Sequence, residues 1–540
     1  MMRTTKWLNV GLAVTLLATT TLVGCSSSST TSEKTADAAS QGGGMDAVQE
    51  LNLIETDEIP TMDASLASDT ISLNVLGQTM EGLIHLDKDG KASPGVATSW
   101  DISPDGLTYT FHLRDDAFWS NGDKVTAKDF EYSFKRTLDP KTKSEYAFMM
   151  AWLKGVKAID DKTLEITLEI PRPYFLTQMA FPTFYPENQK VVEQYGDKYG
   201  GDADKNVYNG PFKLTSWTHD QSWTLEKNDK YWDAKNVKLQ KVNYQVVKDS
   251  NVALNMYESN QIDRMGLVRE QIDLYKDSPE KSTELSQGVY YLMFNNTNKA
   301  LANKKIRQAL TYAIDKQQIV DVALNNGSMP ATSLTPKGTS DTMDGDYTKD
   351  LGDAIKAQDN ASKAKQLLEE GLKEIGETKL PKIVFTNDDS TNGRKLCEFF
   401  QEVWRQKLGI EVEVENIPLK ALLQKTQQHS FDILFSGWNP DYDDAMTYLG
   451  MWTTNSDYNS VQWSNPKYDE LIAAANKETE KKKRIQQMQD AERILMDELP
   501  IAPLFWPGVT LLTRPYVKNW APRKTLPSYD LKYTYIEGKK

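Results

Sequence analysis

The alternation of strand-like and helix-like hydrophobic patterns limits most strongly how this chain of 540 residues can fold. Residues 107–113 and 163–168 alternate apolar and polar side chains, which is typical of half-buried strands. Residues 125–138 instead carry apolar side chains four positions apart, which indicates one face of a helix. Both kinds of element therefore occur early in the chain.

The same interleaving returns in the second half of the chain. Helical patterns cover residues 361–370 and 481–496, and strand patterns over 411–414 and 433–435 lie between them. Strands interleaved with helices predict an α/β architecture. A body of about 500 residues is too long for one hydrophobic core, so we expect two or three domains.

The N-terminus has the form of a secretory signal. Arg3 and Lys6 provide a short positive region, and residues 7–23 are apolar or small. This stretch is too short, and too rich in threonine and glycine, for a comfortable membrane span. A small-residue cleavage site closes it, as in a signal peptide. We therefore interpret residues 1–24 as a signal peptide.

The residues around Cys25 predict a lipid anchor. Leu22-Val23-Gly24-Cys25 resembles the lipobox of bacterial lipoproteins, in which the cysteine thiol is alkylated with diacylglycerol. Two acyl chains are enough for stable anchoring. Residues 25–45 are rich in serine, threonine and glycine, which favours a flexible linker between an anchor and a folded body. The alternative is an ordinary cleaved signal with a cysteine nearby.

Cysteine content and net charge limit the possible disulfides and binding partners. Cys25 and Cys397 are the two cysteines, so lipidation of Cys25 would leave Cys397 without a disulfide partner. Cys397 lies in a helical pattern, where buried packing is favoured over reactivity. The formal charge of −13 becomes more negative when the signal is removed, and it argues against nucleic acid and anionic lipid as partners.

A search for catalytic motifs favours a binding protein over an enzyme. The sequence contains no Walker A, HExxH or G-x-S-x-G motif, and no cysteine pair at zinc spacing. Ser362 to Lys365 match S-x-x-K, but they lie on a charged amphipathic pattern and no K-T-G motif accompanies them. The adjacent acids Asp443 and Asp444 are interpreted as solvated. No catalytic residue, metal or cofactor is predicted.

Seven short stretches carry a family resemblance. They are residues 80–84, 94–100, 119–130, 209–217, 228–232, 306–316 and 437–442. In this order they resemble the oligopeptide-binding and dipeptide-binding proteins of ABC importers. Most of these stretches are scaffold: Thr126, for example, is a plausible helix N-cap, with Asp129 completing a capping box.

The resemblance implies an α/β, periplasmic-binding-protein-like fold with two lobes, an additional domain and a hinge. Three domains are expected in all. Lobe one would combine residues 46–81, 207–287 and 507–540, the additional domain would span 82–206, and lobe two would span 288–506.

The resemblance also implies a peptide-binding site at residues 437–441. Gly437 would allow a close backbone approach, Trp438 would offer an apolar wall, and Asn439 would lie beside them. Asp441 would pair with the α-ammonium of a peptide, because a carboxylate in a closed cleft is unfavourable until a cation arrives. The alternative for Asp441 is that it caps a helix beginning near Asp443.

The remaining wall residues are implied by the resemblance alone. A peptide would be held in extended form, with hydrated pockets for its side chains. Leu419 stands where tryptophan is common, Met293 where an acid can occur, and Phe435 where a basic residue can help to hold the peptide carboxylate. These differences leave the length of the peptide and the contact of its carboxylate open. The wall is expected to include Ser68, Asp69, Thr70, Tyr146, Tyr291, Leu292, Met293 and Asn392.

The function implied is that of a lipid-anchored binding component of an ABC importer. It would lie on the extracytoplasmic face of the bacterial cell membrane, capture short peptides as a monomer, and deliver them to permease subunits served by cytoplasmic ATPases. Apolar substitutions leave a receptor for a signalling peptide, or pheromone, open. Scarce histidine argues against nickel and Asp441 against sugar. A lipid-anchored peptidase and a folding or adhesion factor are further alternatives.

Overall fold

The structure is a computed structural model that describes residues 45–87, 90–341, 345–389, 391–456 and 458–539. Cys25 and all of the predicted linker except Met45 lie outside the described residues. Strands and helices are interleaved along the chain, as the α/β prediction requires.

A four-stranded sheet brings the start of the described chain together with residues about two hundred positions later. Its order is β1 (Glu50–Glu55), β10 (Lys241–Val246), β9 (Ser222–Lys227) and β8 (Phe212–Thr218). Strand β1 is parallel to β10, and the other neighbours are antiparallel. Alternate side chains of each strand enter the core, as Leu51 and Val242 do.

A second four-stranded sheet is fully antiparallel. Its order is β4 (Ala97–Ile102), β5 (Thr108–Leu113), β7 (Thr163–Leu168) and β6 (Leu153–Asp160), and α2 (Ala127–Leu138) packs on β6 and β7. The two predicted strands and the predicted helix are thus confirmed. The capping box is also present, because the Thr126 amide donates to Asp129 Oδ2 over 2.7 Å. Both four-stranded sheets contribute to one continuous hydrophobic core.

A six-stranded sheet forms the centre of a separate part of the chain. Its order is β14 (Met329–Pro330), β18 (Ile501–Trp506), β13 (Val289–Phe294), β17 (Ile433–Trp438), β15 (Val384–Asp388) and β16 (Glu413–Ile417). Strand β13 pairs antiparallel with β17 and β18, whereas β15 pairs parallel with β16 and β17. Both faces of the sheet are covered by hydrophobic cores.

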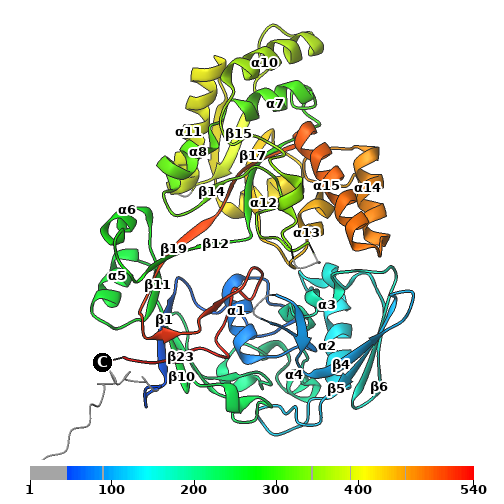
Figure 1. The fold of residues 1–540 in the computed structure, drawn as a ribbon, viewed down its shortest axis with the longest axis vertical. Coiled ribbons are helices and arrows are strands. Elements are labelled where there is room, and N and C mark those ends of the chain that lie inside the picture. The colour runs from blue at the N-terminus through cyan, green and yellow to red at the C-terminus, as the bar shows by residue number, and fades with distance from the viewer. Residues whose placement is uncertain (1–44, 88–89, 342–344, 390, 457, 540) are drawn as a thin grey trace, which may run out of the picture. The chain divides into compact units, whose positions relative to one another are not determined.

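Helices cover the six-stranded sheet on both faces (Figure 1). One core includes α7 (Lys304–Tyr312), α10 (Ala361–Ile375) and α11 (Thr391–Leu408). The other includes α13 (Met446–Leu449), α14 (Pro466–Lys477) and α15 (Lys481–Glu498). The helices predicted over 361–370 and 481–496 are confirmed. Cys397 is buried in α11, and burial raises the pKa of its thiol to about 11, which supports packing rather than reactivity.

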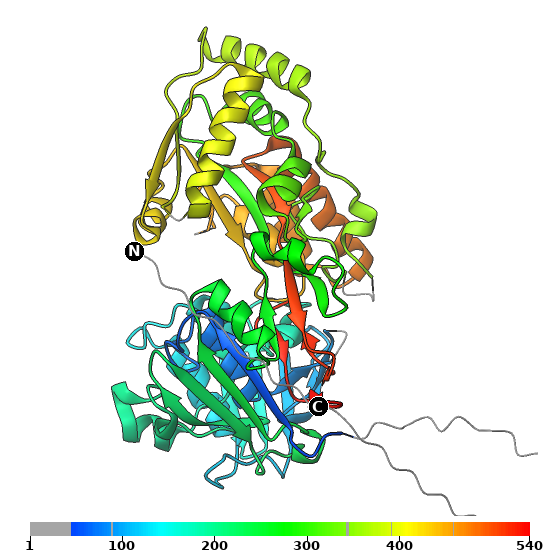
Figure 2. The same ribbon diagram turned by 90° about the vertical axis from the view of Figure 1, so that its left-hand side faces the viewer.

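A three-stranded sheet joins the parts built on these sheets. Its order is β11 (Arg264–Gly266), β19 (Gly508–Thr513) and β12 (Lys281–Leu285). Strand β12 continues into β13, and β18 continues into β19, so two neighbouring segments connect the sheets (Figure 1). Figure 2 shows the same strands, in green and orange-red, from the side. Where they cross, the Ser286 amide donates to the Pro507 carbonyl over 2.9 Å.

Shorter elements complete the described chain. None of the helices in that part is both long and apolar enough to span a membrane. The shorter helices are α1 (Thr70–Thr79), α3 (Phe175–Gln178), α4 (Gln189–Tyr195), α5 (Ser250–Glu258), α6 (Arg269–Ile272), α8 (Lys316–Gln318), α9 (Thr348–Leu351) and α12 (Leu419–Gln427). The shorter strands are β2 (Ile84–Leu86), β3 (Ala92–Pro94), β20 (Val517–Lys518), β21 (Ala521–Pro522), β22 (Tyr529–Asp530) and β23 (Tyr535–Ile536).

Candidate ligand-binding site

Asp441 lies in the loop that follows β17, three residues beyond Trp438. Its amide donates to Thr447 Oγ1 over 3.3 Å, which fixes the backbone of the loop. Its carboxylate forms no hydrogen bond or ion pair with any side chain in the described ranges, and burial raises the pKa of Asp441 to about 7. A carboxylate in this state is poised to receive a cation, since a cation would compensate for its lost hydration.

Asp444, rather than Asp441, supports the helix that begins nearby. Asp444 Oδ1 accepts the amide of Met446, the first residue of α13, over 2.9 Å. Its two oxygens also accept from Arg484 over 2.7 and 2.9 Å, and both side chains are 1% exposed. The helix-cap alternative for Asp441 is therefore wrong, and so is the interpretation of Asp444 as solvated.

The adjacent Asp443 is also engaged. Its carboxylate accepts the amide of Ser340 over 2.8 Å and lies 3.3 Å from the Lys524 ammonium. Only a tenth of its side chain is exposed. The solvated interpretation of Asp443 is wrong as well, because both acids of the pair hold other parts of the chain against the Asp441 loop.

A row of aromatic rings begins at Trp438, which shares Thr447 as a hydrogen-bond acceptor with the Asp441 amide. Trp438 donates its indole N–H to Thr447 Oγ1, and its ring lies 5.6 Å from that of Tyr458. The ring centre of Tyr458 lies 5.5 Å from that of Phe148, and the ring centre of Phe148 lies 5.6 Å from that of Tyr146. Burial raises the pKa of Tyr146, and the charge of Asp441 raises it further. The structure thus connects Tyr146, which the sequence predicted from a separate segment, to Trp438 in the stretch that contains Asp441.

A stacked tyrosine pair lies at the next position of the same loop. The rings of Tyr442 and Tyr174 are 4.3 Å apart and almost parallel. Tyr174 belongs to a segment that the sequence assigned to the additional domain, yet it packs into the core on which Trp438 and Tyr442 lie. Sequence reasoning missed Tyr174, because a tyrosine in a proline-containing loop carries no signal of a distant partner.

Asp69 and Thr70 approach the site from the start of α1. Asp69 caps this helix by accepting the Ser72 amide over 2.8 Å. The charge of Asp69 is also one of those that raise the pKa of Tyr146. Thr70 is exposed and lines a large cavity beside the loop.

The outer half of β17 leaves one backbone edge without a strand. On one side, Ile433 to Trp438 pair with β13 along their whole length. On the other side, β15 pairs with Ile433 and Leu434 alone, so in the described chain no strand pairs with residues 435–438 there. Such an edge offers amide and carbonyl groups to an extended ligand.

Position 437 requires a glycine because the ring of Tyr290, its partner on the neighbouring strand, covers it. A β-carbon at this position would meet the ring of Tyr290 at 2.8 Å, and Tyr290 is its partner in the strand pair. The Tyr290 ring stacks on Phe435 and Phe505, with centroids 5.4 and 4.9 Å away. Aromatic packing therefore accounts for Gly437, and its predicted contact with a ligand stays a prediction.

Several predicted wall residues lie deeper than the sequence suggested, or carry side chains that are not described. Tyr291 and Met293 point into a hydrophobic core, where they are 2% and 3% exposed. Asn392 lies in α11 and Leu419 in α12, and their side chains are outside the described part of the structure. Ligand contact by these four side chains stays a prediction.

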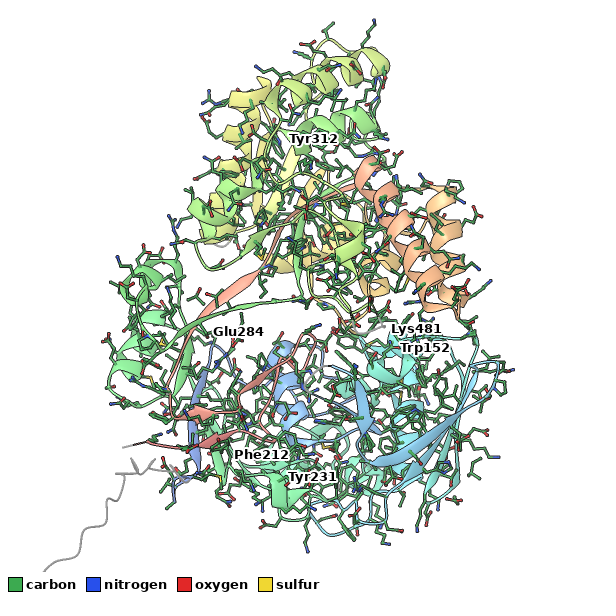
Figure 3. The ribbon with its side chains drawn as sticks, viewed as in Figure 1. Trp152, Phe212, Tyr231, Glu284, Tyr312 and Lys481 are labelled. Atoms are coloured by element: carbon green, nitrogen blue, oxygen red, sulfur yellow. The ribbon has the colours of Figure 1, made fainter. Side chains whose placement is uncertain are left out.

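A cavity of about 940 Å³ lies directly beside the Asp441 loop. Asn439 and Pro440, the two residues before Asp441, line one side of it together with Thr70. The ends of β1 and β10, the three-stranded sheet and residues 520–529 form the remaining walls. Glu284, labelled in Figure 3, belongs to this lining. We call this cavity the chamber; the sequence predicted Thr70 and Asn439 as site residues, and the resemblance implied hydrated pockets, but no pattern indicated the remaining walls.

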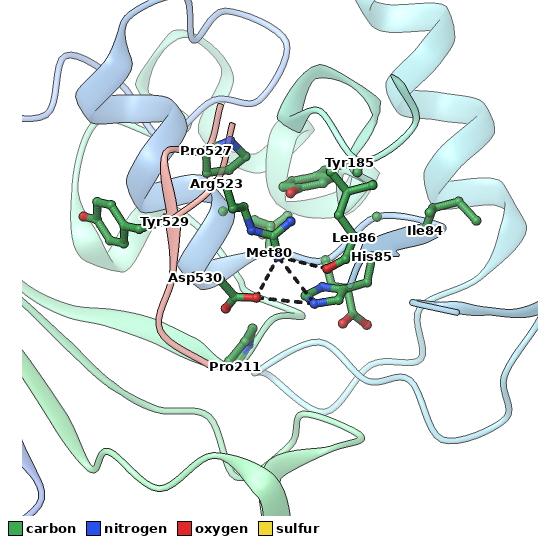
Figure 4. Close-up of a pocket in the computed structure, with 14 residues that line it drawn as sticks. Met80, Ile84, His85, Leu86, Tyr185, Pro211, Arg523, Pro527, Tyr529 and Asp530 are labelled. Atoms are coloured by element: carbon green, nitrogen blue, oxygen red, sulfur yellow. Dashed lines mark hydrogen bonds and ion pairs between the residues drawn. The ribbon is translucent and has the colours of Figure 1, made fainter. Parts of the chain in front are cut away.

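A much smaller pocket shares Arg523 and Tyr529 with the lining of the chamber (Figure 4). Its volume of about 20 Å³ holds little more than one water molecule. Arg523 and His85 converge on the Asp530 carboxylate at 2.6 and 3.3 Å. Burial alone would raise the pKa of Asp530. The charge of Arg523 and the contact with His85 instead hold this pKa well below its ordinary range. This pocket is an internal ion network rather than a ligand site.

Comparisons with known proteins agree with this geometry. The model of the bacterial extracellular solute-binding proteins, family 5 Middle, matches residues 91–460. The oligopeptide-binding protein OppA of Bacillus subtilis is 36% identical over 483 residues, which are 84% of this chain and 87% of that protein. The chain belongs to this family of solute-binding proteins.

Solved structures support the fold of this solute-binding protein. The substrate-binding domain of an oligopeptide ABC transporter from Bacillus anthracis is 40% identical, with a TM-score of 0.78 over 92% of this chain and 100% of that one. The pheromone receptor PrgZ is 32% identical, with a TM-score of 0.78 over 91% of this chain and 100% of that one. The expected two-lobed α/β fold is confirmed by these likenesses.

Proposed function

We propose that this solute-binding protein captures short peptides in extended form and delivers them to the permease of an ABC importer. The Asp441 carboxylate supports this most directly. It is partly buried, has no cation beside it in the described chain, and lies next to an unpaired strand edge. A peptide supplies both an α-ammonium for the carboxylate and a backbone for that edge. The family and its oligopeptide-binding relatives support the same ligand class.

The proposed division into domains follows the sequence resemblance. Lobe one comprises residues 46–81, 207–287 and 507–540, the additional domain 82–206, and lobe two 288–506. The grouping of β1 with β8 to β10, and of β13 with β14 to β18, supports this division. The two segments near Ser286 and Pro507 are the proposed hinge, because both connections between the sheets pass there.

The proposed location is the extracytoplasmic face of the bacterial cell membrane. The protein is anchored as a monomer through a diacylglyceryl group on Cys25, and its permease partners are served by cytoplasmic ATPases. The lipobox-like residues before Cys25 and the extracellular character of the family support this proposal. Cleavage before Cys25 would leave a short polar linker ahead of β1.

A receptor for a signalling peptide is the second candidate function. The likeness to the pheromone receptor PrgZ and the apolar side chains at positions 293, 419 and 435 favour it. Such a receptor would hold one peptide sequence, whereas an importer component would hold many. A lipid-anchored peptidase would instead cleave the peptide.

Native mass spectrometry of the protein extracted from membranes tests these alternatives. We expect adducts of several different peptide masses, and a polypeptide that begins at Cys25 with an attached diacylglyceryl group. Added peptides should be recovered intact after incubation. A single adduct mass would support the pheromone receptor, cleaved products would support the peptidase, and the complete absence of peptide adducts and of binding would contradict the proposed function.

Peptide affinity is expected to depend on pH through Asp441. Because burial raises the pKa of Asp441 to about 7, the ligand-free carboxyl is mostly protonated at pH 5 and ionised at pH 8. A peptide α-ammonium needs the ionised form, so the affinity of an alanine peptide at pH 5 should be about 100-fold below that expected for a fully ionised Asp441. Binding at pH 6 should release close to one proton, measured by calorimetry in buffers of different ionisation enthalpy. Asp441→Asn should remove both effects.

A further inference from the structure

The chamber is large and close enough to the Asp441 site to receive part of the same ligand. Its volume of about 940 Å³ exceeds what one peptide N-terminus needs and lies at the upper end of ordinary ligand pockets. Asn439 and Pro440 form its wall immediately before Asp441 in the chain. An extended peptide advances about 3.3 Å per residue, so a ligand held at Asp441 reaches the chamber within a few residues.

Six charged side chains line the chamber, and five of them have partners of opposite charge. Lys248 lies 3.2 Å from Asp57, and Arg264 lies 2.8 Å from Glu284, which also lines the chamber. Arg523 and Lys524 complete the set of engaged charges, paired with Asp530 at 2.6 Å and with Asp443 at 3.3 Å.

Glu55 is the sixth charged residue of the lining; its carboxylate accepts a hydrogen bond from the Thr56 amide, but no cation among the described residues balances its charge. It is the last residue of β1, and its carbonyl accepts the Val247 amide, which fixes its backbone against β10. In the described ranges, no side chain forms an ion pair or hydrogen bond with its carboxylate. Tyr244 and Tyr529 lie near it, but their hydroxyls hydrogen-bond to each other over 3.0 Å. Burial raises the pKa of Glu55 to about 7.

The surrounding walls suit a long aliphatic stem that ends in a charge. Leu53, Met265, Val509 and Leu511 contribute apolar side chains, and the indole of Trp520 closes one side. The Arg264 guanidinium lies 4.2 Å from the centre of the Trp520 ring, so that ring already accommodates a cation. Lysine and arginine combine such a stem with a positive head group.

We propose that the chamber is a second recognition site, in which Glu55 binds the basic side chain of a lysine or arginine in the captured peptide. This inference rests on the proposed function, because the peptide must first be held at Asp441. It gives the protein a preference among peptides that the α-ammonium contact cannot provide, since every unblocked peptide has an α-ammonium.

Calorimetry with matched peptides tests this site. Alanine pentapeptides carry one lysine at position 2, 3, 4 or 5, and each is compared with the norleucine peptide, which has the same stem without the ammonium. At pH 8 we expect one position at which lysine binds at least about 10-fold more tightly than norleucine, a typical effect of a charge-assisted contact in a partly buried site. In Glu55→Gln this ratio should fall to within about twofold, with the norleucine affinity unchanged.

Glu50→Gln is the matched control variant. Glu50 begins the same strand but is exposed and does not line the chamber, so its substitution should leave the lysine preference intact. If Glu55→Gln failed to fold, the pH dependence of peptide binding by the wild type would still test the role of Glu55. The ratio of lysine to norleucine affinity should be larger at pH 8.5 than at pH 5.5, because Glu55 is ionised at the higher pH and mostly protonated at the lower one. The titratable groups near it are Tyr244 and Tyr529, whose raised pKa values keep them neutral at both pH values, and the other charged side chains of the lining are engaged in ion pairs.

Each outcome separates this inference from the proposed function. If the pentapeptides bind but no position prefers lysine, or if the preference survives in Glu55→Gln, the chamber does not recognise a basic side chain and peptide capture stands. If none of the peptides binds the wild type, the proposed function fails and this inference falls with it.

Discussion

Asp441→Ala is expected to weaken the binding of peptides with a free N-terminus at least about 30-fold. Removing one partner of a buried charge pair typically costs about 2–5 kcal/mol, and 2 kcal/mol corresponds to about 30-fold in the dissociation constant. In this protein the cost should be high, because Asp441 has no other counter-ion among the described residues. Isothermal titration calorimetry at pH 7.5 measures the loss directly.

N-acetylated peptides and a neighbouring variant provide the controls. An acetylated peptide has no α-ammonium, so Asp441→Ala should change its affinity by less than about threefold. Asp443→Asn alters an adjacent carboxyl that is engaged by Lys524 and the Ser340 amide, and it should leave the ratio between free and acetylated peptides unchanged. Equal losses for free and acetylated peptides in Asp441→Ala would contradict the ammonium contact.

The free protein gives an independent check on Asp441. Its pKa is raised in the folded state above the unfolded value of about 4, so ionisation of this group opposes folding and the loss of stability grows as pH rises from about 4 through 7. Asp441→Asn should therefore make the ligand-free protein more stable than the wild type at pH 8, and similar to it at pH 4. A polar group that serves binding at the expense of stability is typical of functional sites.

The elements that the sequence predicted well are those with local signals. Helix α2 combines a regular apolar face with a capping box at Thr126 and Asp129, and the structure confirms both. The long helix α15 and the strand β17 also carry patterns that depend on nearby residues alone. For such elements, the spacing of the apolar residues and the capping residues of the first turn are enough to predict the secondary structure.

The orientation of Tyr291 and Met293 shows where local patterns stop being informative. Both faces of the six-stranded sheet are covered, so every residue of β13 after Tyr290 is apolar or aromatic and no alternation marks one face. In a strand buried on both sides, the sequence does not distinguish the two faces. The pairing with β17 and β18 determines that Tyr291 and Met293 point into one core while Leu292 points into the other.

The place of Glu55 in the chamber could not have been predicted, for a different reason. Glu55 lies near the start of the chain, and its charge is buried because β10, the three-stranded sheet and residues 520–529 assemble around it. An isolated glutamate at the end of a strand is ordinarily solvated. Only the three-dimensional arrangement shows that every other charged side chain of the lining is engaged, whereas no side chain in the described ranges pairs with Glu55.

Asp444→Ala is expected to lower the free energy of unfolding by about 3–5 kcal/mol. The Asp444 and Arg484 side chains are each 1% exposed and form two hydrogen bonds, so removing the carboxylate leaves a buried guanidinium without compensation. The substitution also removes the acceptor for the Met446 amide at the start of α13. Urea denaturation at pH 7 measures the loss.

A double variant separates the charge from the geometry that it holds. Asp444→Leu with Arg484→Met replaces both charges by apolar side chains and should recover most of the lost stability, because a well-packed apolar pair often equals a buried ion pair. Peptide affinity should not recover to the same extent. Arg484 also lies beside Tyr174, which stacks on Tyr442 next to Asp441, and the apolar pair cannot fix that loop by hydrogen bonds. Recovery of both stability and affinity would show that packing alone positions Asp441.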